Sequence, residues 1–197
     1  QEYGDIGAEE EDNHEEAYDY GKENVVFLID AGGDMNAEII VLEGGPPTSS
    51  LQLALRTVAD FMRKKIEQGS QDEFALVFYN TAKKQNDLGQ DGVYVMMDMR
   101  QPNANDIKRV MELDGPAFQQ QVGTYQRAPA GGAPDSVTPA TSLKYGLWVA
   151  QTCLNKRIKA GRALARLIIF SNEQDPSGGR AETKQQILAR ADNLRET

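Results

Sequence analysis

The sequence predicts an α/β fold of three layers, with helices on both faces of a doubly wound, mainly parallel sheet. Three mainly apolar runs, at residues 25–29, 74–79 and 164–170, have the length of strands that are buried on both faces. Segments with apolar residues at helical spacing separate and follow these runs, and this alternation is typical of parallel sheets. The 197 residues are enough for one domain with a sizeable core.

The first half of the predicted domain holds two strands and the long helix between them. The first strand ends at Asp30 and leads into a sharp glycine turn. Residues 37–47 suit either a short strand or an ordered loop, because a Gly-Pro breaker closes them. Ser49 or Ser50 caps the helix, whose apolar residues recur every three or four positions until the second strand.

The second half continues the alternation and ends on a helix. Asp91-Gly92 makes a turn before a strand at 93–97, which suits a hairpin with the preceding strand, and a short helix follows Pro102. The Gly/Pro-rich segment 128–139 predicts a surface loop before the next helix. A last helix is expected at about 181–195. Since such a sheet normally receives another strand there, we expect a C-terminally truncated fragment of a longer protein.

The net charge of −9 lies at the start of the chain. Residues 1–23 hold ten acidic residues and one lysine, and we expect them to form a disordered acidic tail before a domain at 24–197. A solvated spacer is the favoured interpretation of this tail, with a docking segment as the alternative. The rest of the chain is neutral and lacks the basic excess of a domain that holds nucleic acid on its own.

Several classes of site are excluded by the residues present. Cys153 is the one cysteine, so disulfide frameworks and cysteine-rich zinc sites are excluded and a reducing, intracellular compartment is favoured. The one histidine, His14, lies in the acidic tail, which excludes a Ser/His/Asp triad on the domain. Phosphate-binding glycine motifs do not occur, and no apolar run approaches the ~20 residues of a membrane span. We therefore expect no cofactor and no membrane partner.

A ligand crevice is expected where the parallel strands end. Asp30, Asp34 and Glu173 follow predicted strands there, and carboxylates are the ligands that Mg²⁺ and Ca²⁺ prefer. An acid after a buried strand is also often a partner of a nearby loop or helix end. The residues alone leave both interpretations open.

The order of elements resembles a von Willebrand A-type domain. In that family the first strand ends in D-x-S-x-S, and a later threonine and aspartate complete a metal site. The resemblance implies a degenerate site here, because two hydroxyls and one carboxylate are missing. Asp30 matches the first aspartate, Gly32 and Asp34 replace the serines, Thr141 (or Ser142) takes the place of the threonine, and Asn172 replaces the later aspartate.

A narrower resemblance covers almost the whole chain. The sequence is similar to the N-terminal α/β domain of the seventy-kilodalton subunit of Ku, and an acidic leader before the first strand is typical of that domain. The segments that carry the resemblance are VVFLIDA (25–31), EFALVFYNTAKKQN (73–86), GVYV (92–95), IKRVMELD (107–114), SLKYGLWVAQ (142–151) and LIIFSNEQDPSGG (167–179).

The Ku resemblance implies a nuclear protein, taken here as the larger Ku subunit, that pairs with the smaller Ku subunit and encircles broken DNA ends. It implies roles in non-homologous end joining, with other end-joining proteins as partners, and in telomere maintenance. In that family a central β-barrel forms the DNA-encircling ring, and the α/β domain lies at its periphery as a non-catalytic interaction domain.

Two features of the resemblance concern basic residues. A lyase activity on abasic ends is attributed to the family through a lysine before the first strand, where Lys22 is the one candidate here. Its acidic neighbours keep its amine protonated, so we do not expect this activity. The segment between Asn155 and Asn172 contains basic residues and no acidic residue. These basic residues are candidate contacts to phosphate, and the alternative is that they form a solvated helix end. They are Lys156, Arg157, Lys159, Arg162 and Arg166.

Two alternatives to an interaction domain of Ku remain. One is an adhesion-type von Willebrand A domain that captures a partner's carboxylate through Mg²⁺. The other is a Mg²⁺-dependent hydrolase that uses Asp30 and Asp34.

Overall fold

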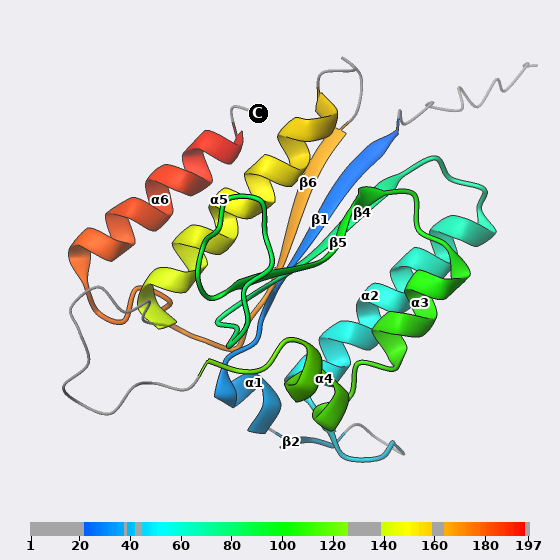
Figure 1. The fold of residues 1–197 in the computed structure, drawn as a ribbon, viewed down its shortest axis with the longest axis horizontal. Helices are drawn as coiled ribbons and strands as arrows, with labels where there is room; N and C mark the ends of the chain where they lie inside the picture. The colour runs from blue at the N-terminus through cyan, green and yellow to red at the C-terminus, as the bar shows by residue number, and fades with distance from the viewer. Residues whose placement is uncertain (1–21, 38, 42–44, 126–138, 159–163, 196–197) are drawn as a thin grey trace, which may run out of the picture.

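The computed structural model describes residues 22–37, 39–41, 45–125, 139–158 and 164–195. The acidic tail lies outside these ranges, and so does most of the predicted loop at 128–139. The helices and strands alternate as predicted (Figure 1). They are β1 (Glu23–Asp30), α1 (Gly33–Ala37), β2 (Ile39–Ile40), β3 (Thr48–Ser49), α2 (Ser50–Glu67), β4 (Glu73–Tyr79), β5 (Val93–Arg100), α3 (Ala104–Met111), α4 (Gly115–Gln121), α5 (Pro139–Ile158), β6 (Leu164–Phe170) and α6 (Ala181–Arg195).

The central sheet has the strand order β5-β4-β1-β6. β4, β1 and β6 are parallel, whereas β5 pairs antiparallel with β4, as the turn at Asp91-Gly92 predicts. Every residue of β1 and β4 is buried, which explains why their sequences are continuous apolar runs rather than alternating ones. The expected mainly parallel, doubly wound sheet is confirmed.

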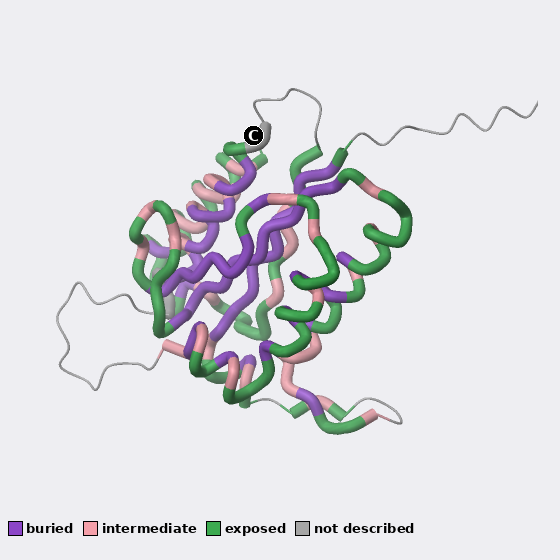
Figure 2. Tube along the Cα trace, turned by 45° about the vertical axis from the view of Figure 1, so that its right-hand side comes forward, coloured by how far each residue is buried: buried purple, intermediate pink, exposed green. Residues whose placement is uncertain are grey.

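The helices form a layer on each face of the sheet (Figure 1). Val25, Phe27 and Ile29 of β1 point to the layer that contains α2, while Val26 and Leu28 point to the layer that contains α5. The buried residues follow the strands and the inner sides of the helices, and much of α6 is exposed (Figure 2). The central position of β1 therefore gives the domain two apolar cores, one on each face.

Helix α5 lies unusually close to the sheet at Gly146. A Cβ atom at this position would lie 3.1 Å from the Cβ of Tyr79 and 3.2 Å from Cδ1 of Leu28. Such distances are tighter than ordinary van der Waals contact, so a glycine allows the helix to reach its depth. This contact fixes the start of α5 against the ends of β1 and β4, where the candidate site lies.

Some local features differ from the prediction. The ambiguous segment 37–47 contains β2, a two-residue strand that pairs antiparallel with β3. Two short helices, α1 and α4, were not predicted, because five and seven residues are too few to show helical periodicity. β1 begins at Glu23, one residue before the expected domain boundary. Ser49 is the N-cap of α2, and Gln52 completes its capping box.

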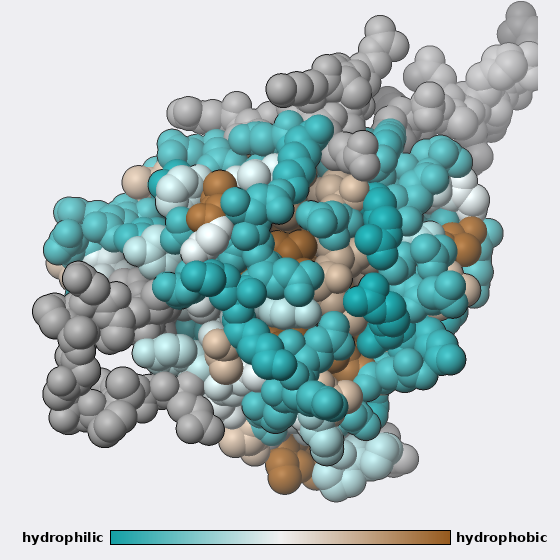
Figure 3. All heavy atoms as spheres, viewed as in Figure 1, coloured by the Kyte–Doolittle hydropathy of each residue, from teal (hydrophilic) through white to brown (hydrophobic). Residues whose placement is uncertain are grey.

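The outer surface is mostly hydrophilic. In the face shown in Figure 3, hydrophobic side chains lie in small, separate spots. The exposed large apolar residues are accordingly spread over several elements, with Ile39 in β2 and Leu188 on α6. Within the described residues, no helix combines the length and the apolar composition needed to cross a membrane.

Candidate functional site

The candidate site lies where β1, β4 and β6 end at the same edge of the sheet. Asp30 is the last residue of β1, Asn80 directly follows β4, and Ser171 directly follows β6. The pairing of the strands places Asp30 beside Tyr79 and Ile29 beside Phe170. The parallel register therefore brings together side chains that are far apart in the sequence.

The buried carboxylate of Asp30 accepts hydrogen bonds from three protein donors. The backbone N–H of Gly32 and the side-chain amide Nδ2 of Asn80 each lie 2.8 Å from Oδ1. The hydroxyl of Ser171 lies 2.9 Å from Oδ2. Asp30 is 3% exposed, so these donors replace the solvation that burial removes.

Asn80 links this carboxylate to the surrounding loops. It has φ 59°, in the left-handed region where asparagine is tolerated better than most residues. Its backbone N–H donates to Oγ of Ser142 over 2.7 Å, and that hydroxyl donates to the carbonyl of Gly92 over 3.1 Å. Its own carbonyl accepts from the N–H of Tyr125 at 2.9 Å. Asn80 thus joins the end of β4 to α5, to the start of β5 and to the segment after α4.

Tyr79 adds a second buried polar group beside Asp30. Burial raises the pKa of the Tyr79 hydroxyl far above its usual range, and the neighbouring Asp30 carboxylate raises it further. The hydroxyl is therefore protonated at neutral pH. It does not suit the role of a general base or a nucleophile.

The predicted metal-site residues differ from one another in burial and in the partners they contact. A Cβ atom at Gly32 would lie 3.0 Å from Oδ1 of Asp30, so a serine at this position would displace that carboxylate. Asp34 and Asn172 are exposed. The Thr141 side chain lies outside the described part of the chain, and Ser142 is engaged with the backbone.

The donor set around Asp30 does not fit a divalent cation. Glycine and asparagine here present N–H groups to the carboxylate, whereas Mg²⁺ requires oxygen ligands. Across the described ranges, no three side chains among His, Cys, Asp and Glu are grouped so as to hold a metal. We infer that the protein donors stabilise the carboxylate in the way that a bound cation does in a metal site.

The contacts that Asn80 and Ser171 make with Asp30 were not predicted from the sequence. Ser171 lay in a segment expected at the crevice, without a role, and Asn80 was not singled out. A signal for Asn80 existed, because Asn80 directly follows the apolar run 74–79 as Asp30 directly follows the run 25–29. A polar residue that directly follows a buried parallel strand is therefore a candidate wherever a charged residue ends the neighbouring strand.

Lys22 lies at the opposite end of β1 from Asp30. Its ammonium is 2.7 Å from Oε1 of Glu73. Nearby, Lys65 and Asp72 form a further ion pair at 2.7 Å, and their hydrogen bond holds the pKa of Asp72 below its usual range although burial opposes this. A lysine that forms a Schiff base must have its side-chain nitrogen free to attack a carbonyl, whereas the nitrogen of Lys22 is engaged by Glu73. The geometry does not favour Lys22 as a nucleophile.

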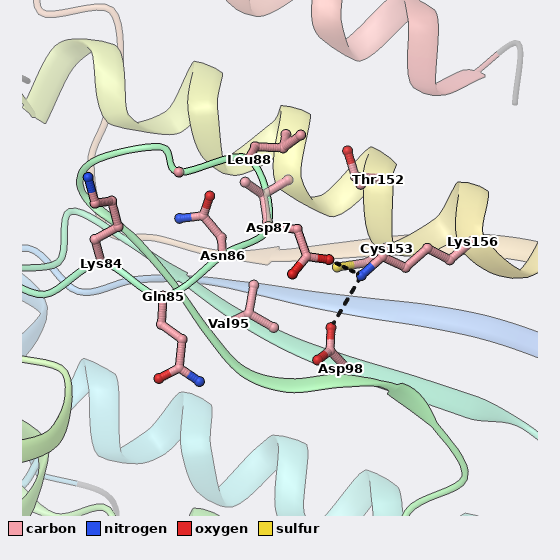
Figure 4. A pocket seen from close by; sticks show the side chains of 12 residues that line it. Lys84, Gln85, Asn86, Asp87, Leu88, Val95, Asp98, Thr152, Cys153 and Lys156 are labelled. Carbon is pink, nitrogen blue, oxygen red and sulfur yellow. Dashed lines mark hydrogen bonds and ion pairs between the residues drawn. The ribbon is translucent and has the colours of Figure 1, made fainter.

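Lys156 opens the basic run that was predicted to contact phosphate. Its ammonium lies between the carboxylates of Asp87 and Asp98, 3.6 Å from the latter, at the rim of a cavity of about 440 Å³ (Figure 4). The hydrogen bond that Lys156 donates to Asp87 raises the pKa of Lys156. Burial raises the pKa of the thiol of Cys153, which lines the same cavity, to about 11. The cation is paired and the thiol is protonated at neutral pH.

The other members of the basic run are only partly described. Arg166 is exposed and donates to Oε1 of Glu23 at 2.7 Å. The Arg157 side chain and the whole of Lys159 and Arg162 lie outside the described residues. The phosphate contacts therefore stay a prediction.

Comparison with known proteins identifies the family. The family model described as the Ku70/Ku80 N-terminal alpha/beta domain matches residues 24–197. "X-ray repair cross-complementing protein 6" of Mus musculus is 28% identical over 178 residues, which are 90% of this chain and 27% of that protein. "ATP-dependent DNA helicase 2 subunit KU70" of Arabidopsis thaliana is 33% identical over 163 residues, which are 80% of this chain and 25% of that protein. The chain thus spans about a quarter of the length of these relatives.

Solved structures match less closely. An uncharacterised membrane-spanning protein from Vibrio fischeri is 12% identical, covers 87% of this chain and has a TM-score of 0.33. Likeness at this level says nothing about function.

The family match confirms the resemblance to Ku and corrects one detail of it. The family pairs the names Ku70 and Ku80. A seventy-kilodalton member is then the lighter of the two that the family name lists, so the expectation that it is the larger subunit is wrong. The matched segment begins one residue after Glu23 and includes every strand of the central sheet except that first residue. This chain belongs to the family of Ku N-terminal α/β domains.

Proposed function

We propose that this domain is a non-catalytic interaction domain of a Ku subunit. The observation that carries this proposal is that the Asp30 carboxylate already accepts hydrogen bonds from Gly32, Asn80 and Ser171. A crevice whose one buried carboxylate is already bonded to protein offers little to a metal, a substrate or a partner's carboxylate. Binding to other proteins is then the task of the outer surface.

In the whole protein we propose the general role of Ku. The complete chain would pair with the other Ku subunit in the nucleus and bind the ends of DNA double-strand breaks for non-homologous end joining and telomere maintenance. Membership of the Ku family supports this proposal, together with the DNA repair and KU70 designations of its relatives. Other end-joining proteins would dock on the exposed faces of the domain.

The alternatives that need a bound metal or a catalytic residue have less support from the described residues. The adhesion-type domain and the hydrolase both need Asp30 as a free ligand, and the lyase needs Lys22 as a neutral amine. Asp30 and Lys22 each have close partners. The plant relatives are named as ATP-dependent helicase subunits, but the sequence of this chain does not contain a phosphate-binding loop motif.

We expect magnesium titration to show no saturable heat at micromolar concentrations of metal. The expectation follows from the donor set at Asp30, and isothermal titration calorimetry measures it directly. The matched control is Asp30→Asn, since carboxylates of the acidic tail also attract Mg²⁺ weakly and non-specifically. A saturable heat in the wild type that disappears in Asp30→Asn would favour the metal-dependent alternatives over an interaction domain.

We expect this chain by itself to bind blunt duplex DNA no more tightly than ~10⁻⁵ M at physiological salt, within the usual non-specific range. The neutral charge of residues 24–197 and the acidic tail are the physical reason. Fluorescence anisotropy with a labelled duplex measures the affinity, and a closed circular duplex is the control for end dependence. Nanomolar binding that requires free ends would contradict the peripheral role.

A further inference from the structure

A groove between α5 and α6 has a composition unlike the rest of the surface. The two helices lie side by side on one face of the sheet (Figure 1), and the groove between them has a volume of about 390 Å³. It is lined by two cations, two aromatic rings and two amides. These are Lys144, Arg190, Tyr145, Trp148, Gln186 and Asn193.

The two cations of the groove rest on aromatic rings. The guanidinium of Arg190 lies 4.6 Å from the centre of the Trp148 ring, and the ammonium of Lys144 lies 4.7 Å from the centre of the Tyr145 ring. Lys144 also donates to Oε1 of Gln186 over 2.9 Å. Within the described residues, no carboxylate forms an ion pair with Lys144 or Arg190, and none lines the groove.

This arrangement differs from that of four other cations in the domain. Lys22, Lys65, Lys156 and Arg166 all have carboxylate partners within the described residues. The cations of the groove, in contrast, keep their positive charge available beside half-buried aromatic rings. A ligand that combines acidic groups with aromatic or apolar side chains complements such a surface.

The chain itself contains a segment of this chemistry. Residues 1–21 carry nine acidic residues, no lysine or arginine, and the three tyrosines Tyr3, Tyr18 and Tyr20. The segment enters β1 at Glu23, and 21 extended residues span up to about 70 Å, enough to reach either face of a domain of this size. Tethering gives such a segment an effective concentration on the order of millimolar, so weak contacts are sufficient.

We propose that the acidic segment 1–21 docks into the α5–α6 groove of its own chain. Its carboxylates pair with Lys144 and Arg190, and a tyrosine ring lies against the open part of Trp148. The contact joins two parts of one chain, so it stands or fails independently of the role proposed for Ku as a whole.

Trp148 makes this contact measurable, because it is the one tryptophan of the chain and lines the groove. The full chain is compared with a variant in which Glu9, Glu10, Glu11, Glu15 and Glu16 are all replaced by glutamine. We expect acrylamide to quench the tryptophan fluorescence of the variant about twofold more strongly, since only the wild type holds the segment over the ring. Sodium chloride at about 0.5 M, where charge attraction is screened within a few ångströms, should bring the wild type to the value of the variant.

Substitutions in the groove separate docking from other effects. When Lys144→Gln and Arg190→Gln are present, the groove no longer holds the acidic segment. Acrylamide should then quench the chain with the five glutamates and the chain with the five glutamines to the same extent. Lys108→Gln is the matched control, because Lys108 is a cation on α3, in the helix layer on the other face of the sheet, and is 70% exposed. It should preserve the difference between the wild-type and the neutralised segment.

A peptide of residues 1–21 gives an independent measurement. Added at millimolar concentration to the chain with the neutralised segment, it should protect Trp148 from acrylamide, and the Lys144→Gln, Arg190→Gln chain should lose this protection. Equal quenching of the wild type and the neutralised variant would overturn the proposal. A difference that persists in the groove variant, or protection by the peptide without Lys144 and Arg190, would overturn it as well.

Discussion

Replacing Asn80 with aspartate is expected to destabilise the domain by about 3 kcal/mol at neutral pH, since the change removes a hydrogen bond to a buried charge and adds a like charge beside it. Asn80 Nδ2 lies 2.8 Å from the Asp30 carboxylate, and both residues are buried. In Asn80→Asp a second carboxylate occupies the position of the amide donor. Two buried carboxylates at this distance cannot both ionise without a large cost in free energy.

The pH dependence distinguishes this repulsion from the simple loss of a donor. The buried carboxylate pair of the variant retains a proton at pH values where the unfolded chain has lost it, so the folded state binds more protons than the unfolded state. The free energy of unfolding therefore increases as the pH falls from 7 to 5. Urea denaturation of Asn80→Asp and Asn80→Ala at both values measures the effect. If both variants show the same loss at both pH values, the two side chains do not contact one another.

Replacing Phe27 with alanine is expected to destabilise the domain by about 3–5 kcal/mol, the usual cost of removing a fully buried aromatic ring. Phe27 lies at the centre of β1 and is 1% exposed. Its ring is 5.6 Å from that of Phe61, 5.9 Å from that of Phe74 and 6.4 Å from that of Phe170. Its removal opens a cavity that a helix and two neighbouring strands all line.

Chemical denaturation followed by the fluorescence of Trp148 measures the loss in Phe27→Ala. The matched control is Ile39→Ala, which removes an apolar side chain that is 69% exposed. The control should change stability by less than about 0.5 kcal/mol, as is usual for exposed positions. A loss for Phe27→Ala no larger than that of the control would mean that these four rings do not form the core on the α2 side of the sheet.

The strands and long helices were predictable because burial imposes a regular pattern on their sequences. β1 and β4 are buried apolar runs, whereas β6 is an edge strand that is interrupted by Arg166 and largely exposed or half-buried, and α2 has both a helical apolar stripe and a capping box. The helices α1 and α4 were missed because one or two turns are too short to show a period of 3.6 residues. Their existence depends on tertiary contacts, such as the burial of Met35 and Phe118 in the core on the α2 side.

The site was only partly predictable, because spacing along the chain shows which residues reach an edge of the sheet but not which atoms they present. Asp30 and the end of β6 were expected in the crevice. The direction of the Asn80 amide was not, since it depends on a left-handed backbone conformation fixed by Ser142 and Tyr125 from distant segments. The proximity of a Gly32 Cβ to Asp30 likewise follows from the turn geometry and not from residue type.

The three donors at Asp30 also bear on how the fold responds to its surroundings. A domain that relies on a bound ion loses stability when the ion is scarce, because occupancy follows the free concentration of the ion. An amide, a hydroxyl and a backbone N–H are part of the chain and are present in every folded molecule. The hydrogen bonds that solvate the carboxylate at the end of β1 therefore form with folding itself and do not depend on the supply of an ion.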